Sequence, residues 1–378
     1  MAEPHVTRVL HVITGLEHGG AEHQLALLLR HLPVECEVAT LTRAGVLGDR
    51  IRCGGVPVHE LGMRGNRDLA ALPRLVRLIR GGRYDVVHTH LYRACVYGRV
   101  AARLAGTPRI IATEHSLGDG QIEGRRTTRA VRALYRATER LGSMTVAVSP
   151  TVAARLRAWG VPPGRVTVIP NGIDPAAFAY DPERRAATRR RLGIPMDAHV
   201  AGTVGRLVPT KRIDLLVRAA ARTPDARLLV AGDGPERARL ERLAAALGLT
   251  GRAVFTGRTD DVASVLAAMD VYAAPSAQET FGVGVLEALA AGLPVVRTAC
   301  PALDDLPRDE APHATRLPAA AGPDAWSAAF GRRAGRVPVP PAVHRYAIAE
   351  QAAGLARLYT GGAPSAGRTR PARESIPT

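Results

Sequence analysis

The sequence predicts an α/β protein made of two doubly wound domains, each with its own parallel sheet, that face each other across a cleft. Short segments rich in Val and Ile alternate with helical segments of about 10–15 residues, a pattern typical of parallel sheets covered on both faces. The pattern occurs twice, because residues 174–198 are polar and interrupted by proline and the alternation restarts after them. With 378 residues, 46% of them hydrophobic, the chain can build two cores of ordinary size.

The first domain is expected over residues 1–175 and the second over residues 176–342. In the first, the expected strands are 8–15, 36–42, 57–62, 85–90, 109–115, 144–149 and 165–174, with helices at 19–32 and 68–82. In the second, the expected strands are 199–207, 226–234, 253–258, 271–276 and 294–299, with helices at 211–221, 236–248, 261–269 and 281–292. Residues 344–361 have helical spacing. Residues 361–378 are small, polar and rich in Pro and Gly, which predicts a disordered tail.

The composition restricts the classes of partner. A formal net charge of +17 suits nucleic acid, an anionic membrane or an anionic substrate. Aromatic residues are only 4%, so stacking platforms for single-stranded nucleic acid are scarce and we expect no nucleic-acid partner. No apolar run reaches the roughly 18–20 residues of a membrane helix, and the start lacks a signal-peptide pattern. Because the four cysteines form no CxxC pair, we expect a cytoplasmic protein.

The stretch SAQETFGVGVLEALAAGLPVV, residues 276–296, carries the most specific pattern. A helix is predicted to begin at about Gly282, so Glu279 lies in the loop at its mouth and Glu287 lies on its second turn. Gly282 and Gly284 allow another molecule to approach the backbone closely, and the free N–H groups of a helix N-terminus bind anions. The alternative is an ordinary strand–loop–helix with a glutamate favoured by the helix dipole.

The segment TVGRLVPTKRID, residues 203–214, contains Lys211, the single lysine of a chain that otherwise uses arginine. The segment begins as a predicted strand, so Arg206 and Lys211 both lie at the carboxyl edge of the sheet, where doubly wound domains bind ligands. Arginine supplies a planar fork and lysine a compact point charge. Together they can clamp a diphosphate. The alternative is that the position of the one lysine is chance.

Two further glycine loops at strand ends are candidates for the same ligand. Gly19 and Gly20 separate the first strand from its helix, and Gly234 lies in AGDGP. Arg258 follows another strand in VFTGR. Each of these loops also fits a plain tight turn.

Three histidines end predicted strands. His88 and His90 in DVVHTH share one face of a strand, and His115 ends the next strand in ATEH. A metal site would need a further carboxylate or histidine at matching depth, and the sequence contains no DxD or HExxH motif. We therefore expect no metal.

Together these segments resemble the retaining glycosyltransferases of family GT4, which have the GT-B fold of two Rossmann-like domains around a cleft. The resemblance covers roughly residues 8–300, and its most specific element is the Glu-x7-Glu stretch from Glu279 to Glu287. Supporting segments are GR…K at Arg206 and Lys211, GGAE at 19–22, IPNGID at 169–174 and AGDGP at 231–235.

The resemblance implies a role for each matching position. Arg206 and Lys211 would hold the donor diphosphate, Glu279 would contact donor-sugar hydroxyls, and Glu287 would bond the ribose. His115 would lie beside the transferred sugar. Further donor contacts would come from Gly19, Gly20, Gly234, Arg258, Phe281, Gly282, Val283, Gly284 and Val285. The final helix, residues 343–360, would cross back to the first domain.

The implied reaction moves a hexose or N-acetylhexosamine from a UDP-sugar with retention, without a metal or other cofactor. The leaving phosphate would accept the proton of the acceptor hydroxyl. The arginine- and alanine-rich composition and residues 113–142 look similar to actinobacterial antibiotic-pathway members of GT4. Among those, the preferred subgroup glycosylates 2-deoxystreptamine or a derived aminoglycoside pseudodisaccharide. Such a cationic acceptor needs carboxylates, and the candidate acceptor residues are Glu17, His88, His90 and Glu114, with Asp119 and Glu123 nearby in sequence.

Other functions on the same fold stay open. A lipid or polyketide glycosyltransferase, a UDP-sugar epimerase, a pseudo-glycosyltransferase and a non-catalytic sugar-nucleotide binder all fit the pattern. Residues 113–142 are basic and partly amphipathic, so they could touch a membrane, although a core face formed by Val131, Leu134 and Tyr135 is favoured. The family often has GG-x-x-E after GLPVV, whereas residues 300–305 differ here, which leaves the donor sugar open. The sequence indicates no oligomeric state.

Overall fold

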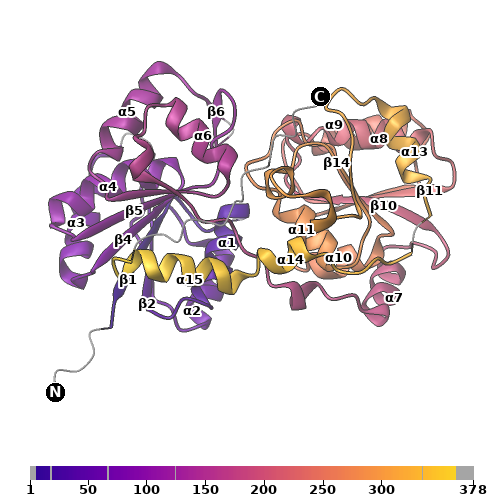
Figure 1. Cartoon of the computed structure of the whole chain (residues 1–378). Coiled ribbons are helices and arrows are strands. Elements are labelled where there is room, and N and C mark those ends of the chain that lie inside the picture. The colour runs from indigo at the N-terminus through magenta and orange to yellow at the C-terminus, as the bar shows by residue number, and fades with distance from the viewer. Residues whose placement is uncertain (1–5, 18, 66–67, 124, 334, 363–378) are drawn as a thin grey trace, which may run out of the picture.

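The computed structural model describes residues 6–17, 19–65, 68–123, 125–333 and 335–362. It shows two α/β domains lying next to each other, each built on its own sheet (Figure 1). This architecture confirms the predicted fold class. Most of the predicted tail, residues 363–378, lies outside the described residues.

The N-terminal domain contains, within the described residues, a seven-stranded sheet in the order β3-β2-β1-β4-β5-β8-β9, with every pair parallel. Its strands are β1 (Arg8–Ile13), β2 (Glu35–Thr40), β3 (Val58–Glu60), β4 (Val86–His90), β5 (Arg109–Glu114), β8 (Met144–Ala147) and β9 (Val166–Val168). Its helices are α1 (Gly20–Leu29), α2 (Gly45–Cys53), α3 (Ala71–Gly82), α4 (Tyr92–Ala105), α5 (Arg129–Glu139) and α6 (Pro150–Ala158). A small antiparallel hairpin joins β6 (Gln121–Ile122) to β7 (Arg125–Arg126).

The C-terminal domain repeats this plan with the order β12-β11-β10-β13-β14-β15. Its strands are β10 (His199–Val204), β11 (Ala226–Ala231), β12 (Ala253–Gly257), β13 (Val271–Ala274), β14 (Val295–Arg297) and β15 (Ala314–Arg316). Its helices are α7 (Pro182–Arg191), α8 (Ile213–Ala221), α9 (Arg237–Ala246), α10 (Val262–Ala268), α11 (Val283–Ala290), α12 (Pro301–Asp304), α13 (Pro323–Phe330) and α14 (Pro341–Arg345). In both sheets the strand order reverses beside the first strand, which is where such folds bind ligands.

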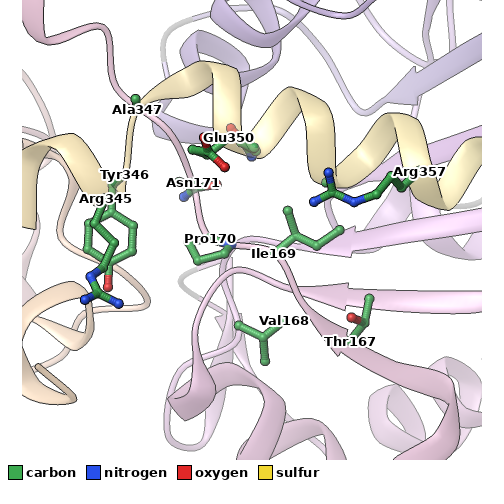
Figure 2. Close-up of a pocket in the computed structure, with 12 residues that line it drawn as sticks. Thr167, Val168, Ile169, Pro170, Asn171, Arg345, Tyr346, Ala347, Glu350 and Arg357 are labelled. Atoms are coloured by element: carbon green, nitrogen blue, oxygen red, sulfur yellow. The ribbon is translucent and has the colours of Figure 1, made fainter. Parts of the chain in front are cut away.

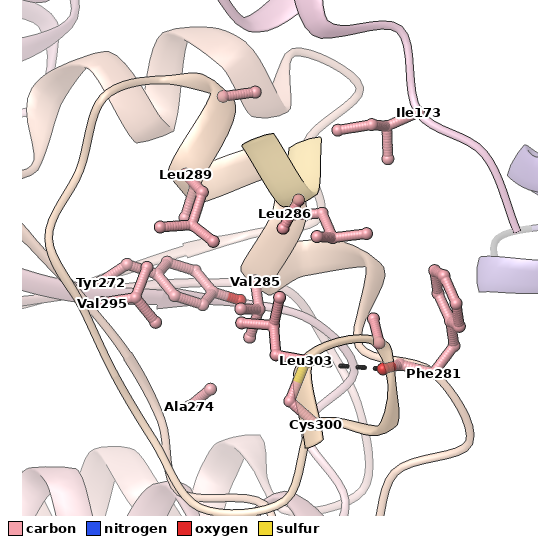
Figure 3. Packing of buried hydrophobic residues seen from close by; sticks show 14 of the residues in the cluster. Ile173, Tyr272, Ala274, Phe281, Val285, Leu286, Leu289, Val295, Cys300 and Leu303 are labelled. Carbon is pink, nitrogen blue, oxygen red and sulfur yellow. Dashed lines mark hydrogen bonds between the residues drawn. The ribbon is translucent and has the colours of Figure 1, made fainter. Parts of the chain in front are cut away.

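Helices cover both faces of each sheet. Because successive side chains of a strand point to opposite faces, each buried strand contributes to two cores. On β1, Leu10 and Val12 pack with α3 and α4, whereas Val9 packs with α1 and the final helix α15 (Ile348–Tyr359). In the C-terminal domain, one core lies under α8, α9 and α13. The other core lies around α11, where Leu286, Leu289 and Val285 pack against Tyr272 and Val295 (Figure 3).

The predicted helix at 344–361 is two helices. α14 packs in the C-terminal domain, the chain turns at Tyr346 and Ala347, and α15 lies along the N-terminal domain (Figure 1). The predicted strand 165–174 was also too long, because pairing ends at Val168 and the following residues form the other crossing between the domains. Among the helices that the structure describes, none is long and apolar enough to span a membrane.

The two crossings are bound to each other. The Ile173 N–H donates to the Tyr346 carbonyl and the Ile348 N–H donates to the Ile173 carbonyl, each at 2.8 Å. Gly172 fits there because a Cβ would lie 2.5 Å from the Ile348 Cα. Buried Gln351 of α15 accepts from the Gly172 N–H at 2.9 Å. Buried Gln24 of α1 donates to the Gly172 carbonyl at 2.9 Å, so one network joins α1, the crossing and α15.

We predict that Gln351→Ala destabilises the protein by about 1–3 kcal/mol, because it leaves the buried Gly172 N–H without a partner and removes one of two hydrogen bonds from the buried Gln24 amide. Urea unfolding monitored by circular dichroism measures the change. The matched control is Glu350→Ala at the exposed neighbouring position of α15, which we expect to stay within about 0.5 kcal/mol of wild type. Equal stabilities of the two variants would contradict the role of the network.

Candidate active site

The loop before α11 has the form that the sequence predicts, and it needs glycine. Gly282 has φ of +106°, and an added Cβ would lie 2.5 Å from the Cys300 Sγ. The Cys300 thiol donates to the Phe281 carbonyl at 3.6 Å (Figure 3). The segment that differs from the family, residues 300–305, therefore lies directly against the start of α11 and supports its first turn.

Lys211 and Glu279 form an ion pair at this helix mouth. The Lys211 Nζ lies 2.5 Å from the Glu279 Oε1, and both side chains are partly exposed. Lys211 lies in a single 3-10 turn, Pro209–Lys211, that follows β10, and the Ala277 N–H donates to the Thr210 carbonyl at 2.8 Å. The structure thus brings two of the predicted catalytic residues into contact with each other.

Arg206 lies at the same sheet edge and is exposed. Its charge acts across the cleft on Glu22 of α1. Burial raises the pKa of the Glu22 carboxyl, the negative charges of Glu123 and Glu17 raise it further, and Arg206 lowers it. The Glu22 carboxylate accepts from its own backbone N–H and lies against Gly19. It therefore fills the N-terminus of α1, where Gly19 and Gly20 are predicted to meet the donor.

Glu287 lies on the second turn of α11, as predicted. Burial raises the pKa of its carboxyl to about 7. Tyr272 of β13 lies beside it: burial raises the pKa of the Tyr272 phenol, and the charges of Glu287 and Glu279 add to the effect. A Cβ at Gly284 would lie 2.7 Å from the Tyr272 hydroxyl, which donates to the Val204 carbonyl at 3.2 Å.

The other predicted donor residues lie along the same edge. Gly234 packs against the loop after β10, because the Leu207 N–H donates to the Asp233 carbonyl at 2.9 Å and a Cβ at Gly234 would overlap the Leu207 carbonyl. Arg258 is exposed beyond β12, two strands from β10. Phe281 and Val285 are buried, while Val283 and Gly284 are partly exposed.

The predicted acceptor residues are mostly in the interior, which corrects the expectation that they meet an acceptor directly. His88 and Glu114 have 0% exposure and His90 has 2%. Both ring nitrogens of His88 have partners, the Tyr359 hydroxyl and the Thr113 hydroxyl. Only Glu17 is exposed.

Glu114 lies on the face of β5 that is covered by α4 and α5. Burial raises its pKa to about 7, the charge of Glu123 adds to the shift, and Arg99 opposes it. Asp119 pairs with Arg155 at 2.9 Å, and the Glu123 carboxylate accepts from the Tyr92 N–H at the start of α4.

The segment 113–142 forms the hairpin and α5. On α5, Tyr135 is fully buried and Val131 packs against the same core, as predicted, but Leu134 is 47% exposed. The hairpin reaches the opposite domain, because the Gln121 amide donates to the Gln278 amide oxygen at 3.1 Å. The Ser149 hydroxyl donates to the Thr280 carbonyl at 2.7 Å. The loop that carries Glu279 is thus held against the N-terminal domain.

Two family models match the chain. Residues 18–177 match Glycosyltransferase Family 4, and residues 184–328 match Glycosyl transferases group 1. Both domains of the chain are therefore similar to glycosyltransferase domains. It is similar to the D-inositol 3-phosphate glycosyltransferases of Mycobacterium tuberculosis and Mycobacterium bovis, with 30% identity over 318 residues. The alignment covers 76% of this chain and spans 65% of the length of those relatives.

Solved structures show the same GT-B fold. The Anabaena protein HepE, in complex with UDP and glucose, superposes with a TM-score of 0.82 at 20% identity, covering 94% of this chain and 100% of HepE. Sucrose-phosphate synthase from Thermosynechococcus elongatus gives a TM-score of 0.75 at 22% identity, covering 94% of this chain and 98% of that one.

Sequence reasoning missed several residues of the site. Glu22 stands in the GGAE segment, but nothing in the sequence shows that its carboxylate folds back onto Gly19. His11 shares a sheet face with His88 and could have been found by pairing the alternation of β1 with that of β4.

A cavity of about 180 Å³ lies at the domain crossing, away from the donor loops, and is lined by Asn171, Tyr346 and Glu350 among others (Figure 2).

We predict that Glu287 makes folding pH-dependent. Because its carboxyl has an ordinary pKa of 4.5 and a pKa of about 7 in the folded protein, the folded state binds the proton more tightly. Stability is therefore fully present below about pH 4.5 and falls as the pH rises through 7. The free energy of unfolding of wild type should fall by an amount on the order of 3 kcal/mol between pH 4.5 and 8, and Glu287→Gln should remove this fall. Urea unfolding of both proteins at several pH values measures it, and parallel curves would contradict the assignment.

Proposed function

We propose that this protein is a retaining glycosyltransferase that moves a hexose or N-acetylhexosamine from a UDP-sugar to a hydroxyl of a small acceptor. The observation that carries the proposal is the Lys211–Glu279 pair at the N-terminus of α11, with Arg206 at the same sheet edge. A cation, a helix N-terminus and a carboxylate are the groups that a diphosphate joined to a sugar requires. Solved proteins of this fold include HepE in complex with UDP and with UDP-glucose.

In the first step, the Lys211 ammonium exchanges Glu279 for the donor diphosphate. The donor diphosphate approaches Lys211 and Arg206, and its charge competes with Glu279 for the Lys211 ammonium. Glu279 is then free to accept hydrogen bonds from hydroxyls of the donor sugar. Glu287 accepts from the ribose hydroxyls, for which it must lose the proton that burial favours.

The bond between the anomeric carbon and the diphosphate oxygen breaks first, and both electrons leave with the phosphate. Arg206, Lys211 and the backbone N–H groups at the start of α11 stabilise the charge that develops on that oxygen. The acceptor oxygen then attacks the same face of the sugar, and its proton passes to the departing phosphate oxygen. These cationic groups can neutralise the leaving group without a metal ion.

The acceptor is proposed to be a cyclitol that carries amino groups. The similar mycobacterial enzymes are named for an inositol phosphate, which is also a cyclitol. Here Glu17, Glu22 and Glu123 interact electrostatically at the carboxyl edge of the N-terminal sheet, and three carboxylates favour a cation over a phosphate. 2-Deoxystreptamine and derived pseudodisaccharides of antibiotic biosynthesis have this chemistry. A lipid or polyketide acceptor, or epimerisation of the UDP-sugar itself, are the alternatives that the assay distinguishes.

We predict that Lys211→Ala lowers kcat/KM about 100- to 1,000-fold, the scale of losing one charge-stabilising group. Lys211→Arg should give an intermediate loss, because a guanidinium can hold Glu279 through two hydrogen bonds and release it less readily. Mass spectrometry of products from UDP-glucose and UDP-N-acetylglucosamine measures transfer. The control is Arg218→Ala, which removes an exposed cation from α8 and should leave transfer unchanged. Undiminished transfer by Lys211→Ala would refute the assignment.

We predict that Glu17→Gln raises KM for an aminocyclitol about two- to fivefold, because an exposed charge pair contributes up to about 1 kcal/mol. The variant should leave KM for uncharged inositol unchanged. Initial rates with 2-deoxystreptamine, paromamine, inositol and inositol 3-phosphate give the comparison. Preferred transfer to inositol 3-phosphate would contradict the proposed amine specificity while leaving the transfer reaction in place.

A further inference from the structure

Four histidines lie together on one face of the N-terminal sheet. His11 on β1 pairs in register with His88 on β4, and His90 on β4 pairs with Thr113 on β5. Because side chains alternate along a strand, His11, His88 and His90 all point to the face that α1 and α15 cover. His115 follows the end of β5, and its exposure is only 8%.

Three of these rings form a hydrogen-bonded row that ends at His115, after the carboxyl end of β5. The His11 Nδ1 lies 3.0 Å from the His90 Nε2, and the His90 Nδ1 lies 3.1 Å from the His115 Nε2. At the inner end, the Cys36 Sγ lies 3.8 Å from the His11 Nε2. At the outer end, the His115 Nδ1 is buried and has no hydrogen-bond partner among the described residues.

All four rings are neutral at ordinary pH. Burial lowers the pKa of His11 to about 3 and that of His115 to about 4, and it lowers the pKa values of His88 and His90 well below the usual range. A neutral imidazole has one N–H donor and one bare acceptor nitrogen. If one nitrogen of a ring accepts a hydrogen bond, the other nitrogen carries the proton and donates to the next ring. The tautomers of His11, His90 and His115 are therefore set together.

A thiol donor at Cys36 would set the direction of the row. Burial raises the pKa of its thiol to about 12, so the sulfur keeps its proton and can donate to the His11 Nε2. The His11 Nδ1–H then donates to the His90 Nε2, and the His90 Nδ1–H donates to the His115 Nε2. The one proton of His115 is left on Nδ1.

We propose that His90 and His11 are positioning residues that hold His115 as a neutral ring with its proton on Nδ1, ready to donate to a hydroxyl of the transferred sugar. The inference rests on the proposed function for its ligand. β5 lies next to β8, after which Ser149 contacts Thr280 beside Glu279, so His115 follows the strand that neighbours the one leading to the Glu279 loop. A sugar hydroxyl would satisfy a buried N–H that otherwise costs about 1–3 kcal/mol.

The row also limits what His115 can do. Removing a proton from an acceptor hydroxyl would create a buried imidazolium, which the surroundings disfavour in every ring of the row. His115 therefore donates and orients, and the proton of the acceptor must leave by the diphosphate oxygen. This division of roles follows from the burial of the row and from the single free nitrogen at its outer end.

A metal ion is the competing occupant, because nitrogens of His11, His88 and His90 lie within 4.8 Å of one another. The hydrogen bonds favour the row. His88 already uses Nε2 with the Thr113 hydroxyl at 2.7 Å and Nδ1 with the Tyr359 hydroxyl at 2.6 Å.

The test combines ring 15N NMR with kinetics on the full chain. Three variants are compared with wild type: His90→Gln, His90→Phe and the control Tyr359→Phe, which removes a hydrogen bond from His88 without entering the row. A His115→Asn spectrum assigns the His115 signals, and the signals distinguish a protonated from a bare ring nitrogen. Metal content is measured on the protein as purified and after incubation with zinc.

We expect wild-type His115 to be protonated on Nδ1 alone, with no titration between pH 5 and 8. His90→Phe should mix the tautomers and lower kcat about tenfold or more, the scale on which orienting partners act, with the donor KM unchanged. His90→Gln, whose amide can both donate and accept, should recover part of kcat. Tyr359→Phe should keep the wild-type tautomer and kcat, although it destabilises the fold.

Several results would overturn the inference: a proton on His115 Nε2 in wild type, an unchanged tautomer in both His90 variants, or one zinc ion per chain held by the three histidines. The NMR result does not depend on turnover. Absence of transfer by wild type together with the Nδ1–H tautomer would therefore reject the proposed function and leave the positioning of His115 standing.

Discussion

The short parallel bridge between Ile173 and Ala347 determines how the two sheets meet. The chain passes between the domains twice, and the two passages bond to each other at 2.8 Å on both sides of Ile173. Gln24 and Gln351 then tie this bridge to α1 and α15, which cover the same face of the N-terminal sheet. α1 begins at Gly20, and Tyr359 of α15 contacts His88 beside the histidine row. A change at the bridge would therefore shift the helices that carry the Gly19–Gly20 loop and cover the histidines.

The carboxylates of the site occupy positions that an anionic donor needs. Glu279 holds Lys211, and the Glu22 carboxylate lies at the N-terminus of α1. Both positive positions therefore already have a negative partner in this structure. If the proposed anionic donor binds here, it has to displace both carboxylates, and a diphosphate would compete for Lys211 where a neutral sugar would not.

The fold, and the location of Arg206, Lys211 and Glu279 at one sheet edge, could be predicted from sequence because both depend on local pattern. Alternating strands and helices fix two parallel sheets, and the carboxyl ends of parallel strands share one edge, which places Arg206, Lys211 and Glu279 together. The acceptor side depends on which way each side chain points after a strand ends. Glu114 and His115 are adjacent in sequence, yet Glu114 turns under α4 and α5 while His115 joins the row on the opposite face. Leu134 was misjudged and Glu22 was missed for a similar reason, since a lost core contact and a folded-back carboxylate depend on tertiary structure.

The single lysine acquires a physical rationale from this geometry. An arginine at position 211 would present a planar fork to Glu279, and a two-bond pair would be hard for a substrate to break. A lysine ammonium is a rotatable point charge that can leave one oxygen for another with little loss. Arg189, by contrast, holds a fixed structure, because it bonds Asp270 and four backbone carbonyls. In the proposed reaction, Lys211 exchanges Glu279 for the donor diphosphate, and this is the one position where the chain uses lysine instead of arginine.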